Sequence, residues 1–302
     1  MYLQILKIFI DIVTPVFFLI LLGYYVGPRL ELDAKTLSRT AYFLLVPCFV
    51  FDIISRVDID IAVAGQMILY TSLTHILVAL TAFIIARLLN RSREITAAFV
   101  IIATFGNVGN LGLSIIDFRL GQAAQTSATI YFITIVLVSF VICVGISSWT
   151  RGTGLSAVLS VFKTPALIAM VPALFFYGTN LEPPLFLSRI TGLLGRAMIP
   201  VMLVTLGVQL SGLGKFNFSR DVVIASCLRL IAAPLIAFGL SFVFSLSGME
   251  IRSGILQAGM PVAVLGSIIA IEYNIIPKFV TTAVLFSTLF SLLTLTILLY
   301  LI

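Results

Sequence analysis

The fold is decided by a glycine-rich stretch inside an apolar segment, Phe105-Gly106-Asn107-Val108-Gly109-Asn110-Leu111-Gly112-Leu113-Ser114. The apolar segment runs from about residue 95 to residue 116, long enough to cross a bilayer. Each glycine costs a helix about 1 kcal/mol relative to alanine, and hydrocarbon cannot satisfy the two asparagine amides. We therefore expect an interrupted helix inside a bundle, where protein or water meets the freed backbone groups.

An alternative interpretation is a close helix crossing, because Gly106, Asn110 and Ser114 recur every four residues. Small residues at this spacing let two membrane helices approach each other closely. The interruption is favoured because a second stretch of the same kind occurs in the second half of the chain.

The composition is that of a membrane protein. The 302 residues are 61% hydrophobic and 10% charged, with a mean hydropathy of +1.21, which excludes a soluble globular domain. Apolar runs of about 20 residues, enough for a transmembrane helix, recur along the whole chain, and the first lacks a cleavage signature and is expected to be retained. The predicted spans are residues 8–26, 37–54, 61–86, 95–117, 125–148, 156–177, 192–211, 221–247, 252–271 and 279–301.

Positive residues in the short connections predict the orientation, because they favour the cytoplasmic side. With the N-terminus outside, eleven fall on the inner side, namely Arg29, Lys35, Arg39, Arg87, Arg91, Arg93, Arg151, Lys163, Lys215, Arg220 and Lys278. Five fall on the outer side, namely Lys7, Arg56, Arg119, Arg189 and Arg252. Both termini are therefore predicted to be non-cytoplasmic. The net charge of +6 then needs no nucleic-acid partner.

The cysteines and the single histidine indicate no catalytic or metal site. Cys48, Cys143 and Cys227 each stand alone in an apolar run, without the spacings of a disulfide or metal framework. His75 shares a helical face with Thr71 and predicts an interhelical hydrogen bond rather than a proton relay. We predict that the protein is not an enzyme and has no cofactor.

The chain contains an internal repeat with an offset of about 150 residues. The matches are Thr14-Pro15 with Thr164-Pro165, Leu37-Ser38-Arg39 with Leu187-Ser188-Arg189, Pro47 with Pro200, Glu94-Ile95 with Glu250-Ile251, and Thr126-Ser127-Ala128 with Thr281-Thr282-Ala283. They predict two halves of five spans, residues 1–150 and 151–302. Because five is odd, the halves must enter the membrane from opposite sides, as inverted repeats do.

The second half has its own interruption, in Gln257-Ala258-Gly259-Met260-Pro261-Val262-Ala263-Val264-Leu265-Gly266. Pro261 removes an amide donor and clashes with the preceding turn. The predicted fold is an all-α membrane protein, with ten transmembrane helices in two inverted five-helix repeats. Helices 4 and 9 are expected to be broken and to cross.

At these residues the chain resembles the auxin efflux carriers and their bacterial organic-acid carrier relatives, within the bile-acid and sodium symporter-like superfamily. The resemblance rests on Gly106-Asn107-Val108-Gly109-Asn110-Leu111-Gly112-Leu113, on Met260-Pro261-Val262-Ala263-Val264 and on Ala270-Ile271-Glu272-Tyr273-Asn274. Family members typically have proline where this chain has Ser114. The short connection near residues 149–155 is similar to that of the bacterial carriers.

The resemblance implies a secondary transporter that moves a small organic anion, an auxin-like carboxylate or a dicarboxylate, by alternating access. It implies an elevator, with a scaffold of helices 1, 2, 6 and 7 and a transport unit of helices 3–5 and 8–10. It also implies a location in the inner membrane and a possible homodimer. A sodium-coupled symporter of the bile-acid type and an anion channel remain alternatives, and coupling to Na⁺ or H⁺ stays open.

The predicted site lies where the broken helices cross, because half-helix N-termini attract anions. The expected substrate-binding residues are Asn107, Gly109, Asn110, Ser114, Arg229, Gln257, Pro261, Val262 and Ala263. Arg229 is either a counter-charge for the anion or a structural partner of a carboxylate or carbonyl group. Asp117 and Glu272 are possible ion-coupling residues, although solvation at a span end is favoured for both, and Asp52 is similarly ambiguous.

Overall fold

The computed structural model describes residues 6–7, 9–56, 61–151, 165–179, 181–212 and 218–302. Over these ranges the chain is helical, and its extended pairing is limited to one isolated bridge between Gly106 and Val262. The predicted all-α class is therefore confirmed. Seven helical segments are long and apolar enough to cross a membrane, namely Phe9–Arg29, Ala34–Ile54, Ile61–Leu88, Gln122–Ser147, Leu185–Ser211, Arg220–Ser241 and Pro277–Leu301.

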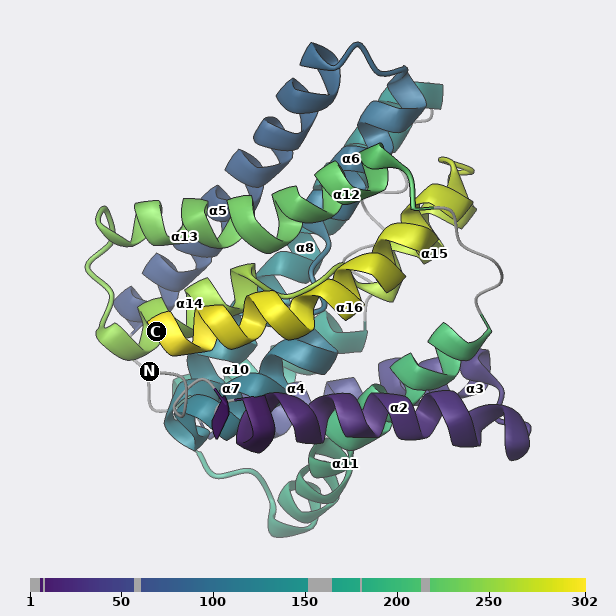
Figure 1. Ribbon diagram of the computed structural model, residues 1–302. Helices are drawn as coiled ribbons and strands as arrows, with labels where there is room; N and C mark the ends of the chain where they lie inside the picture. The colour runs from purple at the N-terminus through teal and green to yellow at the C-terminus, as the bar shows by residue number, and fades with distance from the viewer. Residues whose placement is uncertain (1–5, 8, 57–60, 152–164, 180, 213–217) are drawn as a thin grey trace.

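The described helices follow one another through short connections (Figure 1). In chain order they are η1 (Phe9–Val13), α2 (Thr14–Arg29), α3 (Ala34–Thr40), η2 (Ala41–Leu45), α4 (Val46–Ile54), α5 (Ile61–Leu88), α6 (Arg93–Thr104), η3 (Val108–Gly112), α7 (Leu113–Leu120), η4 (Gln122–Ala124), α8 (Gln125–Arg151), α10 (Pro165–Thr179), α11 (Leu185–Ser211), α12 (Arg220–Cys227), η6 (Leu228–Ala232), α13 (Ala233–Ser241), α14 (Gly248–Ala258), α15 (Val264–Glu272) and α16 (Pro277–Leu301).

Three predicted spans are not among the seven long helices. The fourth is divided into α6, η3 and α7, and the ninth into α14 and α15, because the chain leaves the helix in both glycine-rich stretches. The sixth corresponds to α10, and the predicted residues that precede it, with Lys163, lie outside the described part of the chain. A search for long apolar helices therefore misses the fourth and ninth spans, because the interruptions divide each of them into shorter helices.

The two broken segments begin with the same capping chemistry. Ser92 accepts a hydrogen bond from the amide of Ile95 at the start of α6, where Glu94 lies in the first turn. Ser247 and Glu250 form a reciprocal capping box at the start of α14. Both arrangements satisfy orphan amides and place negative charge at the positive end of a helix. The Glu-Ile match of the sequence repeat thus corresponds to a shared helix start.

Prolines explain three of the wide π-turns. The turns η1, η2 and η6 each end just before a helix that begins with proline at its first or second position, at Pro15, Pro47 and Pro234. Proline donates no amide hydrogen and its ring clashes with the carbonyl four residues earlier. A widened turn before the proline accommodates that ring without ending the segment.

A first group of helices consists of η1, α2–α4, α10 and α11, in which α2 packs along α11 and α4 packs on α10 and α11 (Figure 1). Glycines allow the α2–α11 contact. A Cβ on Gly207 would overlap the carbonyl oxygen of Ile20, and a Cβ on Gly23 would overlap that of Val204. The two backbones therefore touch, which is the close approach that small residues permit between membrane helices.

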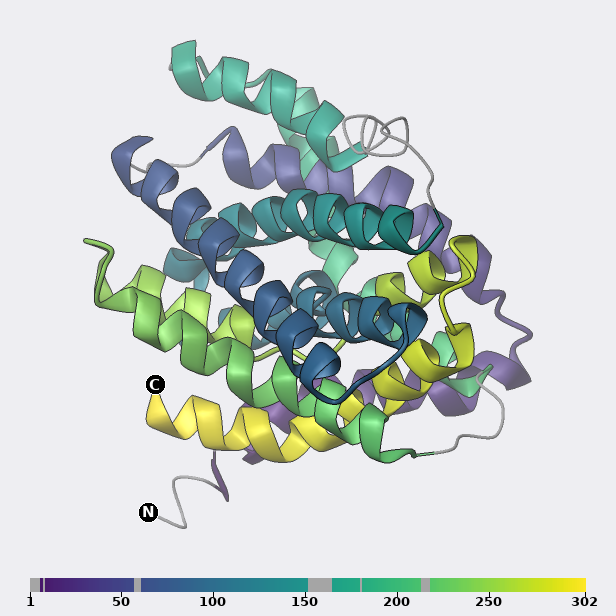
Figure 2. The same ribbon diagram turned by 90° about the horizontal axis from the view of Figure 1, so that it is seen from above.

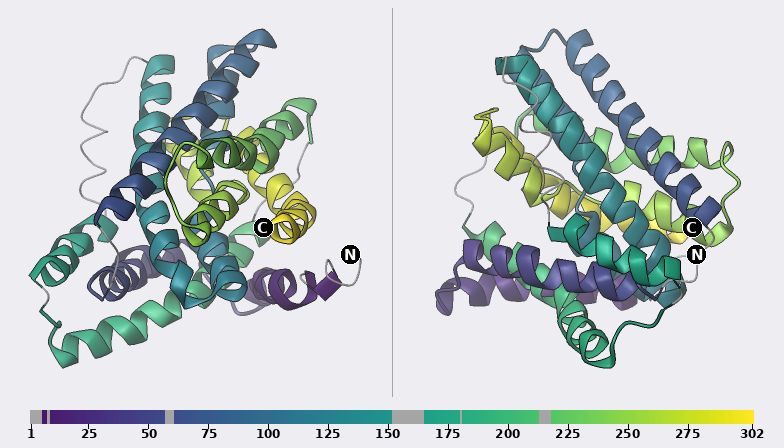
Figure 3. Two further views of the ribbon diagram at one scale, coloured as in Figure 1. Left: turned by 90° about the vertical axis from the view of Figure 1, so that its left-hand side faces the viewer. Right: turned by 180° about the vertical axis from the view of Figure 1, so that it is seen from behind.

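The second group consists of α5–α8 and α12–α16 with their connecting turns. Within it α5, α6 and α8 pack on one another, as Figure 2 shows from above. The helix α13 packs on α5 and α14, and α16 packs on α12 and α15 (Figure 3). Both interrupted segments belong to this group.

We expect Gly207→Ala to destabilise the protein by about 1–3 kcal/mol, because a methyl group there forces α2 and α11 apart. The matched control is Gly239→Ala in α13, where an added Cβ meets nothing within 4 Å. It should leave stability unchanged or raise it by about 1 kcal/mol, the helix preference of alanine over glycine. Thermal unfolding in detergent measures both. Equal melting temperatures for the two variants would contradict the close contact.

Candidate functional site

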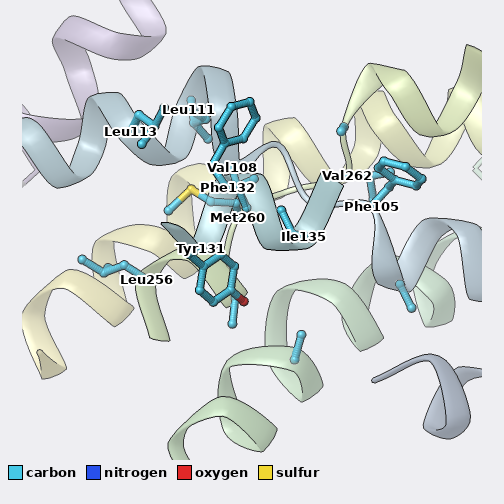
Figure 4. Packing of buried hydrophobic residues seen from close by; sticks show 14 of the residues in the cluster. Phe105, Val108, Leu111, Leu113, Tyr131, Phe132, Ile135, Leu256, Met260 and Val262 are labelled. Carbon is cyan, nitrogen blue, oxygen red and sulfur yellow. The ribbon is translucent and has the colours of Figure 1, made fainter. Parts of the chain in front are cut away.

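The two interruptions lie against each other and satisfy each other's backbone groups. The amide of Asn107 donates to the carbonyl oxygen of Pro261 at 2.7 Å, and the amide of Ala263 donates to that of Phe105 at 2.8 Å. Gly106 and Val262 form the antiparallel bridge between them. In Figure 4 the side chain of Phe105 lies beside Val262, while Val108, Phe132 and Met260 gather on the other side of the crossing. Protein thus supplies the partners that unwound backbone needs away from water.

Arg229, on the π-turn η6, binds the ends of both helices that lead into the crossing. Its side chain is fully buried. Nε donates to the carbonyl oxygen of Met260 at 2.8 Å and Nη2 to that of Gln257 at 3.1 Å, at the end of α14. Nη1 donates to Ala103 at 3.2 Å and lies 3.5 Å from the carbonyl oxygen of Thr104, at the end of α6. One guanidinium group therefore covers the negative ends of two helices.

Gly106 makes room for this guanidinium group. A Cβ at Gly106 would overlap Nη2 of Arg229 and come within 2.6 Å of its Cζ. Of the two roles that the sequence leaves open for Arg229, the structure shows the structural one, with carbonyl groups as partners. The arginine has no exposed surface with which to meet a ligand.

The opposite, positive ends of two helices also meet the crossing. At the starts of η3 and α15, the amides of Val108, Gly109, Val264 and Leu265 have no hydrogen-bond partner among the described residues. Such first-turn amides carry a partial positive charge. Asn110 is the one residue of η3 that is not buried. The crossing thus combines amides that have no described partner with a partly exposed asparagine.

A cavity of about 1350 Å³ lies near this region between the two helix groups. One wall comes from α4, α10 and α11, and the other from Asp117, Gln122 and Gln125 at the end of α7, on η4 and at the start of α8. The first wall includes Arg196 of α11. Gln125 and Arg196 are not among the residues that sequence analysis selected, although an arginine well inside an apolar helix was a usable signal.

Comparison with known proteins now identifies the family. A family model described as membrane transport protein matches residues 8–150 and 146–299. The chain belongs to this membrane transport protein family. It is a multi-pass membrane transporter, in agreement with its seven long apolar helices.

Three relatives show the range of this transporter family. An uncharacterized transporter of Methanothermobacter thermautotrophicus is 28% identical, over 94% of this chain and 95% of its own. A putative malonate transporter of Rhizobium meliloti is 24% identical, over 96% of this chain and 95% of its own. Auxin efflux carrier component 1 of Arabidopsis thaliana is 24% identical over 42% of this chain and 21% of its own. The resemblance to the auxin efflux carriers is thus confirmed.

Other predicted residues of the transporter lie inside the crossing. The carbonyl oxygen of Asn107 accepts from the amides of Leu111 and Gly112 at 3.2 and 3.1 Å, while its buried Nδ2 has no partner in the described ranges. Ser114 donates to the carbonyl oxygen of Asn110 at 2.6 Å. A Cβ on Gly109 would lie 2.8 Å from the ring of Phe132. These contacts hold η3 in place.

Gln257 is fully buried and connects α14 to α8. Its Nε2 donates to the carbonyl oxygen of Ala128 at 3.3 Å. Its Oε1, which has no partner in the described structure, points at the space that Gly112 leaves free of a side chain. The residue therefore packs within the crossing rather than lining the cavity.

The amides of Val262 and Ala263, two of the predicted binding residues, have hydrogen-bond partners within the protein. Val262 donates its amide to Oγ of Ser287 at 3.0 Å, and Ala263 donates to Phe105. Both amides are hydrogen-bonded within the protein because the two extended segments pair with each other and with α16. The free amides of α15 begin one residue later, at Val264.

The acidic candidates lie away from the crossing. Asp117 lines the cavity and accepts a hydrogen bond from Nε2 of Gln122 at 2.8 Å. Asp52 also lines it and forms an ion pair with Arg56 at 2.9 Å. The backbone of Glu272 ends α15, but its side chain is outside the described part of the structure. Two of the three carboxylates thus have polar neighbours near span ends.

His75 makes the interhelical hydrogen bond that the sequence predicts. Its Nε2 lies 2.9 Å from the hydroxyl of Tyr131, which joins α5 to α8. Both side chains are fully buried, and the hydroxyl of Tyr70 reaches the carbonyl oxygen of Ala237 at 2.9 Å nearby on α5. Polar contacts therefore tie the second helix group together.

Replacing Arg229 with methionine should destabilise the transporter by roughly 3–5 kcal/mol, the usual effect of removing one partner from a buried charged network. Four carbonyl groups would each lose the hydrogen bond from the guanidinium group at once. Arg229→Lys should recover only part of this loss, because an ammonium group lacks the planar fork. The control is Arg87→Met, at the exposed end of α5. A melting temperature of Arg229→Met equal to that of Arg87→Met would show that the carbonyl contacts contribute nothing.

Proposed function

We propose that this transporter moves a small organic anion by alternating access around the helix crossing. The observation that carries the proposal is the asymmetry of the helix ends. Arg229 covers the negative ends of α6 and α14, whereas the first amides of η3 and α15 have no partner in the described structure. An anion is the complement of two such N-termini. Asn110, half-buried in the middle of η3, would add a side-chain donor.

Within this proposal the chain forms ten spans in two inverted repeats, residues 1–150 and 151–302. The matching caps of α6 and α14 and the antiparallel pairing of the two interruptions support this arrangement. Broken helices that meet at the interface of inverted repeats are the usual site in secondary transporters. The relatives of this chain are named as transporters, so we propose transport rather than catalysis.

The two helix groups would be the scaffold and the moving unit of an elevator. The glycine contact between α2 and α11 supports a rigid first group, and the buried contacts of His75 and Arg229 support a rigid second one. The cavity lies between the groups. Movement of one group past the other would carry the crossing and its bound anion across the membrane.

The substrate class we propose is a small carboxylate or dicarboxylate. The name of the Rhizobium meliloti relative refers to malonate, and that of the Arabidopsis thaliana relative to auxin, which both carry carboxylate groups. The ion to which transport is coupled, Na⁺ or H⁺, belongs to the same proposal. Binding to purified protein should therefore be measured for a panel of mono- and dicarboxylates, malonate included, with and without sodium.

Asn110→Ala should weaken binding of the best ligand in that panel by roughly ten- to hundredfold, because one charge-assisted hydrogen bond contributes about 1.5–3 kcal/mol. Folding should be nearly unaffected, since the side chain is half-exposed. Pro261→Ala should act differently, because it lets the ninth span regain helix. Transport should fall even if the melting temperature rises.

The control for both variants is Asn217→Ala, which lies outside both interrupted stretches. Binding isotherms, transport rates in proteoliposomes and melting curves would be compared. Wild-type affinity in Asn110→Ala together with normal transport in Pro261→Ala would remove the crossing from the mechanism.

Both termini are proposed to face outward. The connection after α5 would then be cytoplasmic and that before α11 external. The division of positive residues between the connections, eleven on the inner side and five on the outer side, supports this orientation. In a background without Cys48, Cys143 and Cys227, Leu185→Cys should react with a membrane-impermeant maleimide in intact cells.

The partner variant for this experiment is Arg87→Cys, which should react only after the membrane is permeabilised. Both positions are exposed in the structure, so accessibility to water should not limit either reaction. The opposite labelling pattern would invert the topology.

A further inference from the structure

The cavity between the helix groups contains an arginine that the proposed crossing site does not use. Arg196 follows the start of α11 by eleven residues, or about 17 Å of helix, and lies inside the predicted span of residues 192–211. It is exposed and lines the cavity. A charged side chain inside a span is costly unless it faces water, a partner or a ligand.

The guanidinium group of Arg196 is largely unpaired. Its Nε donates to the carbonyl oxygen of Gly192, one turn earlier, at 3.0 Å. No carboxylate lies within ion-pairing distance of it in the described part of the chain, where the two ion pairs are Arg56 with Asp52 and Arg91 with Asp221. Its two terminal nitrogens therefore remain available for a carboxylate, which an arginine fork binds with two parallel hydrogen bonds.

Gln125, on the opposite wall, presents an unused acceptor. Its side chain is 3% exposed, and its Nε2 donates to the carbonyl oxygen of Leu113 at 3.1 Å. That bond fixes the orientation of the amide and leaves Oε1 buried with no partner among the described residues. An amide oxygen can only accept, so a ligand that satisfies it must bring a donor such as a hydroxyl group. Ser55, also on the cavity wall, has a second buried oxygen without a described partner.

We propose that this cavity binds a small hydroxycarboxylate, with Arg196 on its carboxylate and Oε1 of Gln125 accepting from its hydroxyl group. The inference rests on the proposed function, in which the cavity lies between the two helix groups that move past each other. The ligand would touch both helix groups, since Arg196 belongs to the first and Gln125 to the second. Gln125 also holds Leu113, three residues after Asn110, so occupancy of the cavity bears on the crossing.

Malate and succinate are the discriminating probes, because they share a carbon chain and two carboxylates and differ by one hydroxyl group. We expect the wild-type transporter to bind malate more tightly. Arg196→Gln should weaken both acids roughly ten- to hundredfold, the loss of a charge-assisted hydrogen bond. Gln125→Met should weaken malate about two- to tenfold, the range for a neutral hydrogen bond, and leave succinate unchanged. The control is Arg252→Gln, an exposed arginine away from the cavity.

A chemical measurement on the wild-type protein covers the case in which a variant does not fold. Phenylglyoxal modifies accessible guanidinium groups, and mass spectrometry locates the modified arginine. Malate should protect Arg196 and leave Arg252 unprotected. Equal modification of Arg196 with and without malate, or equal affinities in Arg196→Gln and Arg252→Gln, would overturn the inference.

The crossing variant separates this result from the proposed function. If Asn110→Ala weakens binding of another carboxylate while Arg196 gives no protection, the cavity site fails and the crossing site stands. If Arg196 is protected while Asn110→Ala and Pro261→Ala both behave as wild type, the cavity binds its ligand and the crossing mechanism fails.

Discussion

The contact of one buried arginine with the ends of two helices is the interaction on which the structure depends. An interrupted helix in a membrane exposes carbonyl groups that no water can reach. Here the carbonyl ends of α6 and α14 converge on Arg229, and the unwound segments beyond them pair through the bridge between Gly106 and Val262. The buried charge is tolerable because each of its groups points at a negative helix end. Two interruptions that are costly separately become stable together.

Under the function that we propose, this arrangement also determines what the crossing can bind. A cation placed on the carbonyl ends leaves the amide ends of η3 and α15 unmatched, so the remaining electrostatic preference is for an anion. Arg229 is the donor that joins the carbonyl ends of both helices, although Thr104 also accepts from Oγ of Ser139. Under the proposed function, the same residue stabilises the fold and sets the sign of the charge that the crossing prefers.

The interruptions were predictable from sequence, because glycine, asparagine and proline act locally on the helix that contains them. The sequence could not choose between the two roles it left open for Arg229, since its acceptors come from two segments distant in sequence, and backbone carbonyls leave no mark in the residue pattern. For the same reason the sequence did not predict that the amides of Val262 and Ala263 donate to Ser287 and Phe105. Arg196 shows the reverse case. Its place inside a predicted apolar span was visible in the sequence, but the polar wall opposite it was not.

The two helix groups differ in what holds them together, and this difference suits a moving part against a fixed one. Backbones in direct contact at Gly23 and Gly207 leave α2 and α11 little freedom to slide. The second group is tied by hydrogen bonds that run among its own helices, such as that of His75 with Tyr131. A cavity interrupts the packing between the groups, which touch elsewhere, for example where η1 meets α7 and α16. Rigid bodies separated by a hollow can shift against each other without breaking their internal contacts, which is the mechanical requirement of alternating access.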